Sequence, residues 1–364
     1  MTVWVGAALT GVLSALMCLV LIWLGPKDAP DGDRKQQARA VPTAGGLAIF
    51  GSVFLAATAT SLSAYDAERL YNQLNLDGIM PFLILLLITF VVGLMDDWLT
   101  VPTSGKLGGF LVLSLVTTFW ALHGVSANFS FPWLDIMLSP VVTVLGAALW
   151  IFVFANASNF MDGSNGLAMG CLAIMLGTLG YLANVSTDLF GLGGLEELQT
   201  LIILTVSAVL GFLVLNIRGQ IYAGDAGSLT MGTLFAVVSL LLLIYLDWGR
   251  LQVWTPATLA LPFLIDVLLT LVWRARRKKN LLQGHLDHAY QIFRRAGWGH
   301  IQVAVLWWSM TAICALVAVL ADRAGGSLPF WGWLGLLFLG CTGWAWQRQA
   351  YGCLLYTSPS PRDS

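Results

Sequence analysis

The sequence predicts an all-α, polytopic membrane protein with about eleven transmembrane helices, its N-terminus outside and its C-terminus in the cytoplasm. Of its 364 residues, 58% are hydrophobic and only 10% are charged, whereas a soluble domain carries about 25% charged residues. The mean hydropathy is +0.80, and apolar runs recur at about 20 residues, the length that a bilayer-spanning helix needs. A chain of this composition has too few polar side chains to cover a water-facing surface, so most of its surface is expected to face lipid.

Each predicted span follows from one such apolar run. The first is too long for the core of a signal peptide, and no charged segment precedes it, so it is interpreted as a retained helix. The third and fourth are short and carry the weakest signal. The predicted spans cover residues 3–24, 45–62, 79–95, 107–122, 138–155, 167–184, 199–215, 229–246, 256–273, 302–321 and 329–346.

The series of spans shows no internal repeat and no low-complexity linker. This favours a single membrane domain over residues 1–350. Residues 351–364 fit neither a span nor a cytoplasmic continuation, and are predicted to be a non-native or disordered tail.

The distribution of basic residues predicts the orientation. If the spans alternate in direction, all but three of the 18 Lys and Arg residues fall in loops after odd-numbered spans or in the C-terminal tail; the exceptions are Arg69, Arg250 and Arg323. Positively charged loops remain in the cytoplasm. The odd-numbered loops are therefore predicted to be cytoplasmic. An error of one span would break this asymmetry midway along the chain, so the asymmetry supports a count of eleven.

Polar signatures gather in the odd-numbered loops, and the first two differ in strength. Basic residues, among them Lys35 and Arg39, lead into Pro42-Thr-x-Gly-Gly46, where paired glycines permit a close backbone approach. Anchoring at the inner leaflet and a helix start explain this loop by themselves. Asp96 and Asp97 end the third span, although helix C-termini repel negative charge and acids near membrane depth are costly. A divalent cation would offset both penalties, and a solvated helix end is the alternative.

The third and fourth cytoplasmic loops add amides and two further acids. If helical, Asn156, Asn159 and Asp162 share one face because of their i, i+3 spacing. Gly224-Asp225-x-Gly-Ser228 is typical of a tight loop, although Ser228 also suits a helix cap and Asp225 a solvated turn. Four cytoplasmic aspartates in three loops favour a shared metal site, since Mg²⁺ takes one or two carboxylates together with substrate phosphates.

The fifth cytoplasmic loop is the longest and the most basic. Its run from Arg276 to Lys279 would stop the ninth helix at the inner leaflet, where anionic lipid attracts such residues. His285 and His288 lie beside these cations, which favours an anionic headgroup over a metal as their ligand. Asp266 lies inside the preceding span, and an ionisable residue there is functional by default. A buried pair with an arginine of the loop is its alternative role.

Taken in order over residues 34–290, these motifs resemble the polyprenyl-phosphate N-acetylhexosamine-1-phosphate transferases. One motif would be weak evidence, but six in family order on one predicted face are specific. The matching pieces are Pro42-Thr-x-Gly-Gly46, Asp96-Asp97, Asn156-x-x-Asn159-x-x-Asp162-Gly-x-x-Gly-Leu167, Gly224-Asp-x-Gly-Ser228, Asp266 and His285-x-x-His288.

The resemblance implies transfer of a HexNAc-1-phosphate from a UDP-N-acetylhexosamine to undecaprenyl (polyprenyl) phosphate at the bacterial inner membrane, with release of UMP and no nucleic-acid partner. It implies Mg²⁺, or Mn²⁺, as the cofactor, and family members often form homodimers. It implies Asp225 and Asp97 as metal ligands, and Asp96, Asp97 and Asp162 as catalytic residues. The implied substrate-binding residues are Lys35, Arg39, Asn156, Asn159, Asn165, Asp266, Arg276, His285 and His288.

Two departures from the family pattern bear on the donor. Asn165 stands where many bacterial members have Asp, so no charge-dependent role is given to it. The segment Gly284-His-Leu-Asp-His-Ala-Tyr-Gln291 differs from the His-rich run of the peptidoglycan enzyme and looks closer to the branch that starts O-antigen or exopolysaccharide intermediates. A phospho-N-acetylmuramoyl-pentapeptide transferase is the alternative within the family.

Two further alternatives concern class and mechanism. A transporter would place its binding residues near the bilayer midplane on interrupted helices, whereas here the polar signatures cluster at one edge and only Asp266 lies within a span. Within the transferase class, the lipid phosphate attacks directly, or an aspartate first forms a covalent intermediate. The sequence does not choose between these two routes.

Overall fold

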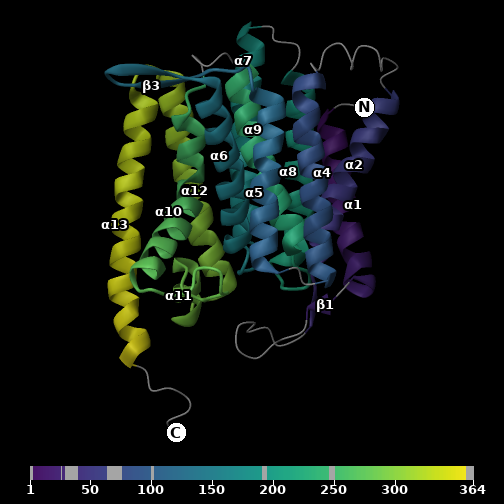
Figure 1. The fold of residues 1–364 in the computed structure, drawn as a ribbon. Helices are drawn as coiled ribbons and strands as arrows, with labels where there is room; N and C mark the ends of the chain where they lie inside the picture. The colour runs from purple at the N-terminus through teal and green to yellow at the C-terminus, as the bar shows by residue number, and fades with distance from the viewer. Residues whose placement is uncertain are drawn as a thin grey trace.

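The computed structural model describes residues 3–25, 27–28, 40–63, 76–99, 102–190, 195–245 and 251–357. Within these parts of the chain, a long helix forms at every position where the sequence predicts a span (Figure 1). The long helices are α1 (Val3–Leu24), α2 (Gly45–Ser63), α4 (Leu76–Leu99), α5 (Thr103–Leu122), α6 (Pro140–Met161), α7 (Leu167–Phe190), α8 (Leu195–Asn216), α9 (Gly224–Tyr245), α10 (Trp254–Arg276), α12 (His300–Ala324) and α13 (Leu328–Thr357). The shorter elements are α11 (Ala289–Arg295) and the strands β1 (Lys27–Asp28), β2 (Val41–Pro42), β3 (Ala127–Phe131) and β4 (Leu134–Leu138).

The predicted class, an all-α polytopic membrane protein, is confirmed. Among the described residues, nine helices are long and apolar enough to cross a membrane, and α2 and α7 contribute shorter apolar stretches, Gly45–Ala59 and Leu167–Ala183. The weak third and fourth spans form full helices of 24 and 20 residues, α4 and α5. Both helices are longer than the predicted spans, because polar residues next to the apolar runs are also helical: Asp96 and Asp97 in α4 and Lys106 in α5. The count of eleven crossings and the orientation remain predictions.

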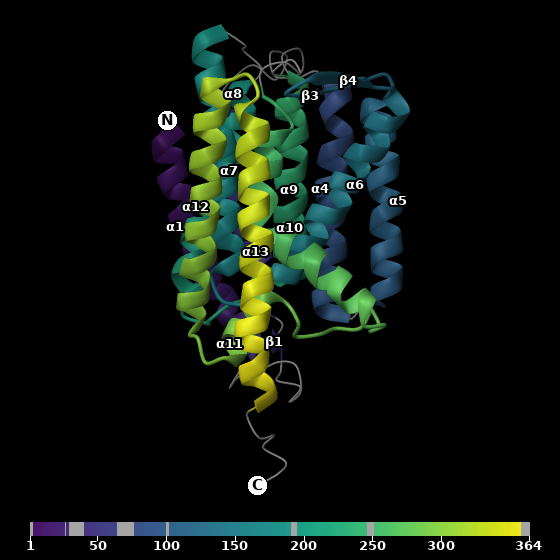
Figure 2. The same cartoon turned by 90° about the vertical axis from the view of Figure 1, so that its left-hand side faces the viewer.

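Helix α9 lies at the centre of the bundle. It packs against α2, α4, α6 and α7, and its apolar stretch is entirely buried within the protein (Figures 1 and 2). A helix that is apolar on all sides is expected at such a position. Hydroxyl groups of α9 are satisfied within the helix at several positions, as where Thr233 Oγ1 donates to Leu229 O at 2.8 Å. The first turn of α9, which carries Asp225, is therefore fixed in the middle of one end of the bundle.

The two ends of the bundle differ. Helix α11 and the segments around it lie at one end, and the antiparallel β3–β4 hairpin covers the other (Figure 2). The sequence predicts only a loop where this hairpin forms. Its strands are held by Trp254, whose Nε1 donates to Ser130 O at 2.6 Å and whose ring lies 5.1 Å from that of Phe131. Helix α1 begins at the hairpin end and α13 ends at the α11 end (Figure 1), as an odd number of crossings requires.

The last helix extends beyond the predicted domain boundary at residue 350. Helical backbone continues to Thr357, and the ring of Tyr351 packs edge-on against Phe293 at 5.0 Å. The start of the predicted tail is thus helical, and residues 358–364 lie outside the described residues.

Candidate active site

The paired glycines Gly45 and Gly46 bring α2 onto the start of α9. Gly45 N donates to Tyr222 O at 2.9 Å, and Gly46 N donates to Ala223 O at 2.8 Å. A Cβ atom at Gly46 would lie 2.7 Å from the carbonyl carbon of Ala226, which real Cβ atoms do not tolerate. The close approach predicted for these glycines is confirmed, and the neighbour is the turn that carries Asp225.

Asp97 holds the same turn from the side of α4. Its Oδ1 accepts the N–H of Asp225 at 2.9 Å, and its Oδ2 accepts the N–H of Ala226 at 3.1 Å. The first N–H groups of a helix have no partner within the helix, and its N-terminus favours negative charge. Asp97 therefore positions α9 and does not line the cavity described below. These two hydrogen bonds stabilise a carboxylate at the end of α4, and the catalytic and metal-binding roles of Asp97 remain predictions.

Lys106 connects the acids of two motifs. Its Nζ lies 2.8 Å from Asp96 Oδ2 and also forms an ion pair with Asp225 Oδ2. The three side chains are only partly exposed, at 17 to 22%, so the lysine offsets carboxylate repulsion where water screens it poorly. In the sequence, Lys106 was interpreted only as one of the basic residues of the loops. The signal that could have identified it is its position as the one basic residue between the third and fourth spans.

The polar face of α6 completes the surroundings of Asp225. Asn159 Nδ2 donates to Asp225 Oδ1 at 2.7 Å and to Ser228 Oγ at 2.9 Å. Asn156, Asn159 and Asp162 all line one cavity, so the predicted common face exists. Asp162 ends α6, and burial together with the nearby charges of Asp225 and Asp97 raises its pKa well above the usual range.

The cavity has a volume of about 540 Å³ and lies at the α11 end of the bundle. It joins the α6 face to Lys106 and to the segment after α10. Of the predicted site residues, it is lined by Asn156, Asn159, Asp162, Asn165, His285 and His288. Four further charged or titratable residues line the cavity without having been predicted as site residues, namely Lys106, Arg294, Arg295 and His300.

Other predicted residues lie elsewhere. Asp96 and Asp225 do not themselves line the cavity. Both form ion pairs with Lys106, which does. Arg276 is exposed at the end of α10 and is not among the residues that line the cavity. Lys35 and Arg39 lie outside the described residues.

Asp266 is buried beneath the cavity and not in its wall. Only 2% of it is exposed, and its Oδ1 and Oδ2 accept the N–H groups of Ala289 and Tyr290 at 2.7 and 3.4 Å. His288 Nδ1 lies 3.6 Å from Oδ1. The buried acid thus satisfies the unpaired N–H groups at the start of α11. This corrects both predicted roles of Asp266, substrate contact and a pair with an arginine.

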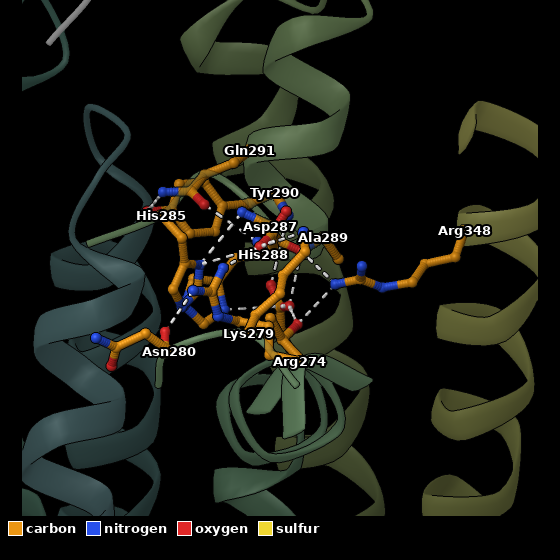
Figure 3. Close-up of polar contacts among 12 residues, drawn as sticks. Arg274, Lys279, Asn280, His285, Asp287, His288, Ala289, Tyr290, Gln291 and Arg348 are labelled. Carbon is orange, nitrogen blue, oxygen red and sulfur yellow. Dashed lines mark hydrogen bonds and ion pairs between the residues drawn. The ribbon is translucent and has the colours of Figure 1, made fainter. Parts of the chain in front are cut away.

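The loop between α10 and α11, residues 277–288, carries the two histidines and is called the histidine loop. The rings of His285 and His288 lie 4.9 Å apart (Figure 3), and His288 stacks on Phe160 and Tyr290 at 6.0 Å from each. Asp287 forms ion pairs with Arg274 and Lys279. Burial opposes the effect of these cations, but they lower the pKa of Asp287 overall.

His285 is expected to remain neutral across the physiological range. Burial, together with the charges of His288 and Arg274, lowers its pKa from 6.5 to about 4. A lowered histidine pKa means that the imidazolium forms only as the pH falls toward 4. In ¹³C-histidine NMR, the His285 signal, assigned by its loss in His285→Gln, should not shift between pH 7.5 and 5.5. A midpoint near 6.5 would contradict this environment.

Residues 163–165 line the cavity between α6 and α7, and His300 contacts two of them. Its Nδ1 lies 3.0 Å from Ser164 Oγ and accepts the N–H of Asn165 at 3.3 Å. Asn216 Oδ1 accepts the N–H of Gly166 at 2.7 Å. These contacts fix Asn165 at the cavity through its backbone, so that its place in the wall depends on residues of α8 and α12.

Comparison with known proteins gives a matching family model and enzymes of similar sequence. Residues 79–243 match glycosyl transferase family 4. The chain is 26% identical over 321 residues to the phospho-N-acetylmuramoyl-pentapeptide-transferase of Shouchella clausii, covering 79% of this chain and 86% of the relative. The enzymes of the same name from Bacillus mycoides and Bacillus anthracis are 26% and 25% identical over 316 and 312 residues, with the same coverage.

Proposed function

Because the chain belongs to the polyprenyl-phosphate hexosamine-1-phosphate transferases of glycosyl transferase family 4, we propose that it moves a HexNAc-1-phosphate from a UDP-N-acetylhexosamine to polyprenyl phosphate and releases UMP. The lipid phosphate oxygen attacks the phosphorus next to the sugar. The bond from that phosphorus to the bridging oxygen breaks, and UMP leaves with the other phosphate. We place this reaction at the cytoplasmic face of the bacterial inner membrane.

One observation carries this proposal, namely that Lys106 lies in the cavity wall and joins Asp96 to Asp225. Arg294 and Arg295, in the last turn of α11, also line the cavity. Phosphoryl transfer depends mainly on positioning and on neutralising charge, and these cations supply both. A cavity edged by cations above a carboxylate cluster suits a diphosphate substrate and a phosphate acceptor.

The carboxylates fit Mg²⁺ of the kind that binds together with a phosphorylated substrate. Among the residues that the structure describes, no three His, Cys, Asp or Glu side chains converge on a metal position, but Mg²⁺ typically takes only one or two carboxylates and completes its shell with phosphates and water. Asp162 lies close enough to Asp225 for their charges to interact. We propose Asp225 and Asp162 as its ligands, because Asp162 lines the cavity; Asp97, the other predicted ligand, holds the turn that carries Asp225. When bound, the ion would neutralise charge that develops on the diphosphate.

The protein's own groups then have separate tasks. Lys106 would bind a phosphate oxygen while Asp96 holds its ammonium group in place. Asn159 keeps the Asp225 carboxylate oriented, through its 2.7 Å hydrogen bond. Asp162, the acid that faces the cavity, would orient the lipid phosphate. His285 and His288 would contact the sugar phosphate from the opposite wall, with His285 neutral and therefore acting by hydrogen bonding.

Release of UMP tests the reaction class. Purified protein with UDP-GlcNAc, undecaprenyl phosphate and Mg²⁺ is expected to form UMP, measured by chromatography. Asp225→Asn keeps the shape of the side chain and removes its charge, so it is expected to abolish release. The matched control is Asp135→Asn, an exposed position on the β3–β4 hairpin at the opposite end of the bundle, which should leave the rate unchanged. Equal rates in both variants would contradict the assignment of Asp225.

A UDP-N-acetylmuramoyl-pentapeptide donor is the second candidate, because the relatives reported above are named for that activity. The segment Gly284–Gln291 favours a HexNAc donor instead. A panel of UDP-sugars separates the two. UMP release with the pentapeptide donor and not with UDP-HexNAc would assign the chain to the peptidoglycan branch.

A further inference from the structure

The last helix, α13, contacts the segment that carries the cavity histidines. Two adjacent polar side chains of α13, Gln347 and Arg348, bind the backbone of residues 287–289. We infer that α13 positions the histidine loop for substrate binding, and that Gln347 and Arg348 are positioning residues of the active site. This inference rests on the proposed function for its kinetic consequence, and on geometry alone for its structural one.

Arg348 is fixed in an aromatic slot. Its guanidinium carbon lies 4.4 Å from the ring centre of Trp273 and 4.3 Å from that of Trp344. From this slot it donates to Thr270 Oγ1 at 2.9 Å and to the carbonyl of Asp287 (Figure 3). Stacking on two rings leaves the planar fork little freedom. The side chain therefore joins α10 and α13 to a loop carbonyl between the two histidines.

Gln347 binds the backbone carbonyl of Ala289, two residues after Asp287. It is 3% exposed, and its Nε2 donates to Ala289 O at 2.9 Å. The N–H of the same residue, Ala289, donates to Asp266 Oδ1 at 2.7 Å. Ala289 is thus held by α10 on its N–H side and by α13 on its carbonyl side. A buried donor left without its acceptor is costly, so this register is strongly favoured.

These contacts act directly beside residues that line the cavity. His288 precedes Ala289, and His285 lies two residues before Asp287. On its other side Asp287 pairs with Arg274. Most of α13 is exposed on the outside of the bundle, and its polar contacts with the rest of the protein concentrate at this end. A shift of the loop backbone would therefore move both imidazoles relative to the opposite wall.

The test removes each contact at constant size. Gln347→Leu and Arg348→Met are compared with Gln349→Leu, an exposed position on the same helix. Loss of one buried hydrogen bond is expected to raise KM for the UDP-sugar about tenfold, with kcat within about twofold of the unsubstituted protein. KM for the lipid acceptor should not change. The control should match the unsubstituted protein in every respect.

A second readout does not depend on activity. The histidine loop begins in the exposed basic run 276–279, where trypsin cleaves. A released loop is expected to be cut about tenfold faster in Gln347→Leu and Arg348→Met, and at the original rate in Gln349→Leu. If Arg348→Met does not fold, the cleavage rate of Gln347→Leu alone decides whether α13 positions the histidine loop.

The possible outcomes separate the two claims. If cleavage and KM are both unchanged in Gln347→Leu, α13 does not position the loop. A fall in thermal stability and kcat with no change in KM would assign Gln347 a role in packing only, and would also overturn the inference. If the unsubstituted protein uses no UDP-sugar, the proposed function fails, and the cleavage rates still decide whether α13 holds the loop.

Discussion

Lys106→Met is expected to lower kcat/KM for UMP formation by about 100-fold or more. The lost contact between the ammonium group and a phosphate oxygen is worth about 3 kcal/mol, and each 1.4 kcal/mol corresponds to about a factor of ten. The expected loss of activity is larger than for a single contact, because the carboxylates of Asp96 and Asp225 would repel each other without the ammonium group that now lies between them. Steady-state kinetics of UMP release measure the effect.

The control for this prediction is Lys278→Met, since Lys278 is exposed in the histidine loop and makes no ion pair among the contacts of the described residues. It should retain full activity. Adding Asp96→Asn to Lys106→Met removes the unpaired charge and is expected to restore thermal stability without restoring kcat. If the double variant regains activity as well, Lys106 acts only as a structural counter-ion.

Gly46→Ala is expected to destabilise the protein by about 2 kcal/mol or more and to abolish activity with it. The new Cβ would meet backbone atoms of Ala226 and Gly227 at the start of α9, and backbone cannot rotate aside as a flexible side chain does. The displaced turn carries Asp225. Thermal unfolding in detergent, followed alongside UMP release, measures both effects.

Gly108→Ala is the matched control, because a Cβ at this position on α5 meets no atom within 4 Å. Alanine is favoured over glycine in a helix by about 1 kcal/mol, so this variant should be as stable as the parent or more so. Loss of activity in Gly108→Ala, or full activity in Gly46→Ala, would contradict the proposed docking of α2 on α9.

The sequence predicted the helices well because each is specified locally. A run of about 20 apolar residues has few alternatives to a buried or lipid-facing helix. The gathering of Asn156, Asn159 and Asp162 on one face likewise follows from helical spacing. The identity of the motifs was also readable, since six of them occur in family order.

The roles of single acids were less predictable, because they depend on contacts between distant segments. Asp97 accepts the N–H of a residue 128 positions away, and Asp266 accepts one 23 positions away. An acid that binds the N–H groups at a helix start and an acid that binds a ligand look alike in sequence. Lys106 was missed for the same reason, because one of 18 basic residues becomes distinctive only when the fold brings two carboxylates to it.

The fate of the phosphate next to the sugar tests the central claim most directly. UDP-GlcNAc, or the active donor from the panel, is labelled with ³²P at that phosphate and incubated with the protein, polyprenyl phosphate and Mg²⁺, and the lipid is extracted. Transfer of a sugar phosphate predicts label in the lipid fraction, unlabelled UMP in the water phase, and neither with Asp225→Asn. Label that remains in the water phase as UDP, with sugar alone on the lipid, would contradict the account.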